Sequence, residues 1–129
     1  MTKILFIEED LTTFEIRKCI AAVLEGIQPL ELFHAKDATE GLELLDEVRP
    51  DVIIIGHEER SETELFMDGL TMNHPPIVVD HEENDAEGKR SGVTYIKKDG
   101  SLEGIHQLLR TAQSLAALGG VDTDLDSSH

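Results

Sequence analysis

Charged and histidine side chains collect at four points along the chain, each directly after a short apolar run. These groups are Glu8-Glu9-Asp10, His57-Glu58-Glu59, Asp80-His81-Glu82-Glu83 and Lys97-Lys98-Asp99. Carboxylates gathered at one place can hold a divalent cation. Two imidazoles with a carboxylate can instead bind zinc or another transition metal. The His-Glu-Glu triplet occurs twice, at His57 and at His81, so the chain has two histidines and several carboxylates at the ends of neighbouring runs. The sequence therefore offers Glu9, His57 and His81 as candidate metal ligands.

The apolar runs before these groups are typical of buried strands. Residues 3–7, 51–55, 77–79 and 93–97 are short and largely apolar, and 30–35 is a weaker run of the same kind. Residues with helical spacing lie between the runs and after the last one. Five strands alternating with helices predict an α/β, doubly wound parallel sheet with right-handed crossovers. Since such sheets collect function at the carboxyl ends of their strands, the charged groups should share one edge.

The helix expected after Asp10 ends at Gly26, and Asp37 should cap the helix that follows. The first of these helices has the apolar residues Phe14, Ile16, Ile20, Val23 and Leu24. Cys19, the only cysteine, lies among these apolar residues, so we expect it to be a buried, inert thiol. A single cysteine forms no internal disulfide, which fits a reducing compartment.

The acidic composition limits the classes of partner. The 129 residues include 27 Asp and Glu against 11 Lys and Arg, which gives a formal charge of −16. Such a field repels phosphates and anionic lipid, so we expect no binding to nucleic acid or membrane. It favours basic protein partners or divalent cations. No apolar run approaches a membrane span and the first residues do not resemble a signal peptide, so we expect a cytoplasmic protein.

One domain accounts for most of the chain. We place it at residues 1–117 and expect its fourth helix, in the polar segment 81–91, to be short or irregular. A final amphipathic helix starts near Leu102, and Gly119-Gly120 should end it. Residues 118–129 have little apolar surface to pack, which predicts a flexible acidic tail.

Three segments, taken in order on these elements, resemble the receiver domains of response regulators. Residues 4–9 resemble the family's first strand with its acidic pair, and residues 49–55 resemble the run into its phosphorylated aspartate. Residues 92–100 resemble its fifth strand, with Lys98 at the position of the invariant lysine and Tyr95 at that of the switch aromatic. The resemblance spans most of the chain and implies a flavodoxin-like five-stranded sheet of order 2-1-3-4-5 with helices on both faces.

The resemblance is incomplete at the residues that carry the family's chemistry. Counted from the proline before the third strand, Gly56 takes the place of the phosphorylated aspartate and has no side chain to modify. The acidic pair is Glu8-Glu9 in place of aspartates, and Asp80 takes the place of the switch hydroxyl. A carboxylate there would repel a phosphoryl group but could pair with Lys98. The changes resemble a pseudo-receiver, in which Glu8 or Glu9, Asp80 and Lys98 form a standing charge network that holds one conformation.

We therefore expect a non-enzymatic signalling module of the two-component type that acts by protein–protein contact without aspartate phosphorylation. Its expected contact face comprises the polar segment 81–91, the fifth strand with Tyr95 and the last helix. This face would meet a basic partner or a second copy of the chain. No cofactor is expected beyond weak binding of Mg²⁺ or another divalent cation.

Other interpretations remain open. A flavodoxin-like domain could bind a small ligand or a metal at the same strand ends, although no glycine-rich phosphate loop follows the first strand. A phosphorylatable receiver would need Asp51 or Asp80 as acceptor, and Asp51 opens its strand instead of closing it. The switch position falls on Asp80 or on its neighbour His81. Acids at strand ends also commonly face solvent and cap the next helix, and Tyr95 could be a packing residue.

Overall fold

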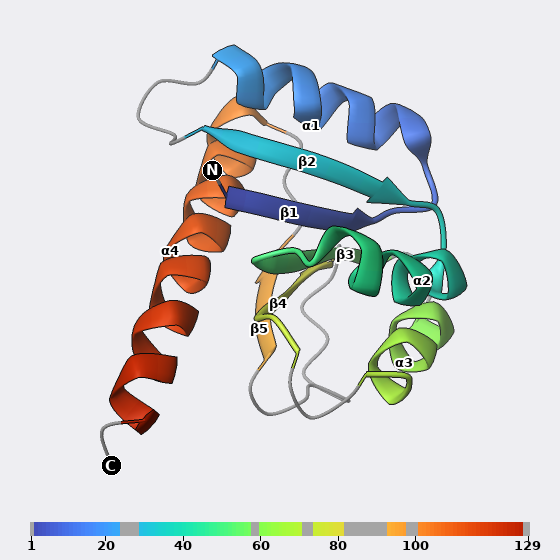
Figure 1. Cartoon of the computed structure of the whole chain (residues 1–129). Helices are drawn as coiled ribbons and strands as arrows, with labels where there is room; N and C mark the ends of the chain where they lie inside the picture. The colour runs from blue at the N-terminus through green and yellow to red at the C-terminus, as the bar shows by residue number, and fades with distance from the viewer. Residues whose placement is uncertain are drawn as a thin grey trace.

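Strands and helices alternate along the chain as the apolar runs predict (Figure 1). A computed structural model describes the protein at residues 2–23, 29–57, 60–70, 74–81, 93–97 and 101–127. In chain order the elements are β1 (Thr2–Ile7), α1 (Leu11–Val23), β2 (Leu30–Ala35), α2 (Ala38–Val48), β3 (Val52–His57), α3 (Arg60–Asp68), β4 (Ile77–His81), β5 (Val93–Lys97) and α4 (Leu102–Ser127). The strands are parallel and lie in the order β2-β1-β3-β4-β5. The flavodoxin-like sheet expected from the sequence is confirmed, including its strand order.

Side chains of the central strands alternate between two apolar clusters, one on each face of the sheet. Ile4, Phe6 and Ile54 belong to the cluster under α1 and α4, whereas Leu5 belongs to the cluster under α2 and α3. Figure 1 shows the same division, with α1 and α4 on one side of the sheet and α2 and α3 on the other. Cover on both faces explains why the runs in β1 and β3 are continuously apolar. Gly56 follows Ile54 by two positions in β3 and therefore faces α1 and α4.

α1 presents only part of the expected stripe to the sheet, since Phe14 is buried and Ile20 packs against the core, as predicted. Its buried residues are Phe14 and Arg17, while Ile16 is 51% exposed and Val23 is 74% exposed. Cys19 is exposed, so the prediction of a buried thiol is wrong. The apolar pattern was misleading because an arginine stem can cover apolar surface as well as an aliphatic side chain. The helix therefore turns its arginine inward and leaves two branched residues in solvent.

α2 begins and ends at the signals in its sequence. The Asp37 side chain accepts the backbone N–H of Glu40 at 2.9 Å, which confirms the expected cap. At the other end Arg49 adopts a left-handed conformation with φ 53°, and its N–H donates to the carbonyl of Leu45 at 3.0 Å. Pro50 then separates the helix from β3, so the strongest strand of the sheet starts at a defined position.

α4 continues through Gly119-Gly120 to Ser127. The glycine pair therefore does not end the helix, while the flexibility expected of residues 118–129 stays a prediction. A glycine inside a helix costs about 1 kcal/mol relative to alanine, but it leaves the backbone hydrogen bonds intact. The buried residues of α4 lie between Ile105 and Ala112, and its last turns project away from the sheet (Figure 1).

Two further expectations concern the fourth helix and membrane spans. The short or irregular fourth helix was expected at 81–91, and within that segment only His81 is described, as the last residue of β4. No helix in the described ranges is both long enough and apolar enough to cross a membrane.

Candidate functional site

The carboxyl ends of β1, β3 and β4 bring three residues together on the face covered by α1 and α4. Glu8 directly follows β1 and extends its ladder, since its N–H donates to the carbonyl of Ala35 at 2.9 Å. Gly56 and Asp80 are register partners in β3 and β4. Glu8 is 1% exposed and Asp80 is 2% exposed, so both carboxyl groups are buried. The predicted convergence of charged residues at this edge is therefore present for Glu8 and Asp80.

Glu8 fills the space that a side chain at position 56 would occupy. A Cβ atom built on Gly56 would lie 1.9 Å from Oε2 of Glu8 and 2.8 Å from its Cδ. Real side-chain contacts are never this short, so a larger residue at 56 and the present position of Glu8 exclude each other. The glutamate is one methylene longer than the aspartate of an ordinary acidic pair. That extra length carries its carboxyl group across the sheet to the position that Gly56 leaves open.

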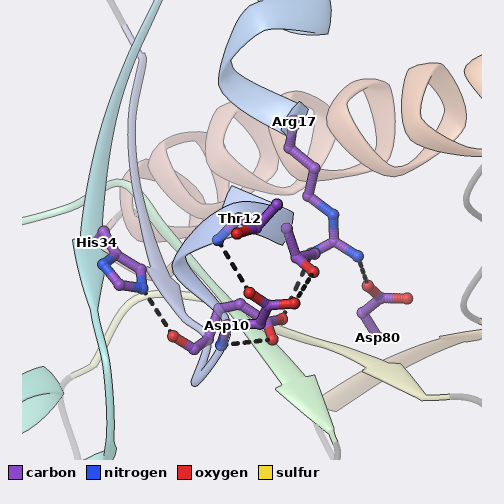
Figure 2. Close-up of polar contacts among 7 residues, drawn as sticks. Asp10, Thr12, Arg17, His34 and Asp80 are labelled. Carbon is purple, nitrogen blue, oxygen red and sulfur yellow. Dashed lines mark hydrogen bonds and ion pairs between the residues drawn. The ribbon is translucent and has the colours of Figure 1, made fainter. Parts of the chain in front are cut away.

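Arg17 supplies the counter-ion for the two buried acids. Its Nη2 forms a direct ion pair with Oδ2 of Asp80, and its Nη1 lies 4.0 Å from Oε2 of Glu8. Figure 2 shows the side chain descending from α1 with its guanidinium directed at Asp80. The guanidinium carbon also lies 5.8 Å from the ring centre of Phe6, which is within cation–π range. In the part of the chain that the structure describes, one buried cation thus faces two buried carboxylates.

A second layer of contacts holds Glu8 in this position. Its Oε1 accepts the backbone N–H of Asp10 at 3.3 Å, and its carbonyl oxygen lies 2.7 Å from Nε2 of His34. A carbonyl only accepts, so Nε2 of His34 carries the proton and donates it (Figure 2). The His34 ring stacks on Phe14 with 4.8 Å between ring centres, and Phe14 packs edge-on against Phe6 at 5.7 Å. The glutamate is thus held by one contact to its carboxyl group and one to its backbone.

Asp10 links this cluster to α1. One of its carboxylate oxygens accepts the N–H of Thr12 at 2.9 Å and the other accepts the Thr13 hydroxyl at 3.0 Å, which caps the helix (Figure 2). The cap fixes where α1 starts and therefore which residues face the sheet. Arg17 lies in the second turn after this cap, above the end of β4.

The other residues expected at the site have different outcomes. Glu9 lies beyond the end of β1 and is exposed, so it does not join the cluster. Lys98 lies outside the described residues. The partner that the structure places on Asp80 is Arg17, a residue that the sequence analysis did not single out. Tyr95 is half-buried and packs against the cluster under α2 and α3, on the opposite face of the sheet.

The candidate transition-metal set stays a prediction. His57 and His81 are register partners, so the repeated triplet does place two histidines side by side on neighbouring strands. Their side chains are not among the described features, and Glu9 is exposed. Within the part of the chain that the structure describes, no group of three His, Cys, Asp or Glu residues is arranged to hold a metal ion.

A cavity of about 350 Å³ lies at the other end of the sheet. It is bounded by Leu42 and Arg49 of the α2 end, by Leu70 after α3, and by Pro50 and Pro75 at the starts of β3 and β4. Ligands of open α/β sheets bind beyond the carboxyl ends of the strands. This cavity therefore gives no support to a small-ligand domain that uses the charged edge.

Comparison with known proteins identifies the fold. No protein-family model matches the chain, and no curated protein matches it. Among solved structures, the two-component transcriptional regulator AraC from Clostridium phytofermentans is similar with a TM-score of 0.73 and 14% identity, covering 95% of this chain and 99% of that chain. The receiver domain of a Francisella response regulator has a TM-score of 0.68, 22% identity and coverage of 92% and 99%. The chemotaxis response regulator CheY4 of Vibrio cholerae has a TM-score of 0.66, 21% identity and coverage of 87% and 98%. The chain thus has the fold of response-regulator receiver domains.

Proposed function

We propose that this protein is a pseudo-receiver, a module of two-component-type signal transduction that acts through protein contacts in the cytoplasm without aspartate phosphorylation. The observation that carries the proposal is the position of the Glu8 carboxyl group. It occupies the space in which an aspartate at position 56 would begin, with 1.9 Å between Oε2 and an added Cβ. The receiver fold is kept, while the place of its phosphorylated residue is filled from another strand.

The chemistry of phosphoryl transfer explains why the filled pocket matters. A carboxylate nucleophile must be accessible, in line with the donor, and close to cations that offset the developing charge. Gly56 offers no nucleophile. The neighbouring carboxylates of Glu8 and Asp80 are buried, and Arg17 engages Asp80 directly. Among the described residues on this face of β3, a small phosphate donor in solution therefore finds no exposed nucleophile, which supports a non-enzymatic role.

The charge of the chain supports a protein partner with a basic surface. A formal charge of −16 attracts cations over several ångströms and repels nucleic acid and anionic membranes. We place the contact face on β5 with Tyr95, on α4 and on the polar segment 81–91 between β4 and β5. Leu102 at the start of α4 is 57% exposed and supplies an apolar contact point there. A second copy of the chain is the alternative occupant of this face.

Acetyl phosphate with magnesium tests the proposal on the full chain. After incubation, intact-mass spectrometry should show no added phosphoryl group, while an ordinary receiver domain treated in parallel should gain one. A stable adduct that maps to Asp51, Asp80 or another carboxylate would overturn the proposal and restore the phosphorylatable receiver.

A further inference from the structure

The magnesium ion that receiver domains use at this edge does not fit the residues that the structure describes there. Magnesium requires about six oxygen ligands at roughly 2.0–2.1 Å in octahedral geometry. Position 56 supplies no carboxylate, Glu9 is exposed, and Asp80 already holds the guanidinium of Arg17. The space between Asp80 and Glu8 contains the guanidinium, whose Nη1 lies 4.0 Å from Oε2 of Glu8.

We propose that Arg17 is a tethered cation that takes the place a divalent metal would need between Glu8 and Asp80, and that it keeps this pocket closed to metal. The inference builds on the proposed function, because it concerns the same edge of the receiver fold. In this proposal the positive charge beside Glu8 and Asp80 belongs to an arginine of the chain itself. The charge of the pocket is therefore the same at every metal concentration.

The electrostatics favour this arrangement. An arginine side chain stays protonated at every physiological pH, so its charge is permanent. The Arg17 side chain is 5% exposed, and Nη1 makes no hydrogen bond to any described residue. The guanidinium therefore serves as a positive charge with one strong contact, at Asp80, and lies against the Phe6 ring. Among the described residues, two carboxylates face one cation, and a divalent ion could take the place of that cation if Arg17 were absent.

Arg17→Met separates the charge from the packing. Methionine keeps an unbranched apolar stem against Phe6 and removes the guanidinium. Lys18→Met is the matched control, because it removes the same charge from the next residue, which is exposed. Any gain in metal binding that comes from a more negative protein as a whole will appear equally in both variants.

The experiment titrates manganese(II) alone into the full chain and follows free manganese by electron paramagnetic resonance. Wild type and Lys18→Met should show the same weak, non-saturating association. Arg17→Met should gain one saturable site that binds at least about tenfold tighter, because the two buried carboxylates lose the guanidinium as a counter-charge. Adding Glu8→Gln and Asp80→Asn to Arg17→Met should remove that site.

Two results would overturn the inference. One is a saturable manganese site in wild type that Glu8→Gln abolishes. The other is a folded Arg17→Met variant that binds no better than Lys18→Met. If Arg17→Met unfolds alone, circular dichroism with added manganese replaces the titration: recovery of the fold supports the inference, and no recovery overturns it. Manganese binding by wild type without a phosphoryl adduct would refute the tethered cation and leave the proposed function standing, whereas an adduct would refute the proposed function.

Discussion

Replacing Gly56 with alanine should show whether a side chain at this position and the carboxyl group of Glu8 require the same space. Gly56 has no left-handed backbone conformation, so the change to alanine acts through contacts. An alanine Cβ would lie 1.9 Å from Oε2 and 2.8 Å from Cδ of Glu8. The glutamate cannot simply swing away, because Asp10 N–H holds its other oxygen and Arg17 lies on its open side.

The magnitude follows from two opposing terms. Overpacking a tight interior costs about 1–3 kcal/mol. Replacing glycine with alanine in a compatible strand position stabilises by about 0.4–1 kcal/mol, because the unfolded chain loses freedom. Gly56→Ala should therefore lose about 1–2 kcal/mol in the wild-type background. In a Glu8→Ala background the obstacle is gone, so the same change should become neutral or stabilising.

Urea unfolding followed by circular dichroism measures this double-mutant cycle. The four proteins are wild type, Gly56→Ala, Glu8→Ala and the double variant, and the coupling between the two sites should equal the overpacking term of about 1–3 kcal/mol. Equal effects of Gly56→Ala in both backgrounds would refute the reasoning, because they would show that the glutamate does not occupy the space beside Gly56.

Three other predictions follow from the same residues and their neighbours. Arg17→Met should lower the free energy of unfolding by about 3–5 kcal/mol at neutral pH, with Lys18→Met within about 0.5 kcal/mol of wild type, as measured by urea unfolding. A deficit no larger than that of Lys18→Met would contradict this. Cys19 should react with a thiol reagent in the native protein at a rate close to that in urea, and strong protection would contradict its exposure. Arg49→Gly should raise the melting temperature by a few degrees, since a left-handed residue other than glycine costs about 1 kcal/mol; a lowered value would contradict this.

The sheet was predictable because its signals are local and redundant. Continuous β-branched runs such as 52–55 can be buried only between two layers of helices, and the charges after each run mark the strand ends. The cap at Asp37 could also be predicted from the sequence. An aspartate three residues before a glutamate can accept a backbone N–H group that has no partner in the first turn of the helix. The convergence of Glu8 and Asp80 near Gly56 followed from topology alone.

The counter-ion of the site was not predictable in the same way. The expected pairing of Asp80 with Lys98 stays a prediction, because Lys98 lies outside the described residues, and the structure places on Asp80 an arginine from α1. Hydropathy assigned Ile16 and Cys19 to the inward stripe of that helix, because an arginine is normally counted as a surface residue. The sequence signal that could have corrected this is the spacing of Phe14 and Arg17, which share a stripe three residues apart below the Asp10 cap.

The end of α4 shows a second limit of local signals. A glycine pair is a common helix stop, yet it acts only when the chain gains hydrogen bonds by turning there. In this protein the helical backbone continues to Ser127.

The central claim is that Glu8 and Arg17 permanently fill the pocket in which a receiver domain is phosphorylated. The most direct test adds beryllofluoride, a mimic of the phosphoryl group, together with magnesium to the ¹⁵N-labelled full chain. Amide resonances of Glu8, Gly56 and Asp80 should stay at their starting positions throughout the titration. A saturating shift of these three amides would show that the pocket opens to a phosphoryl mimic and would contradict the claim.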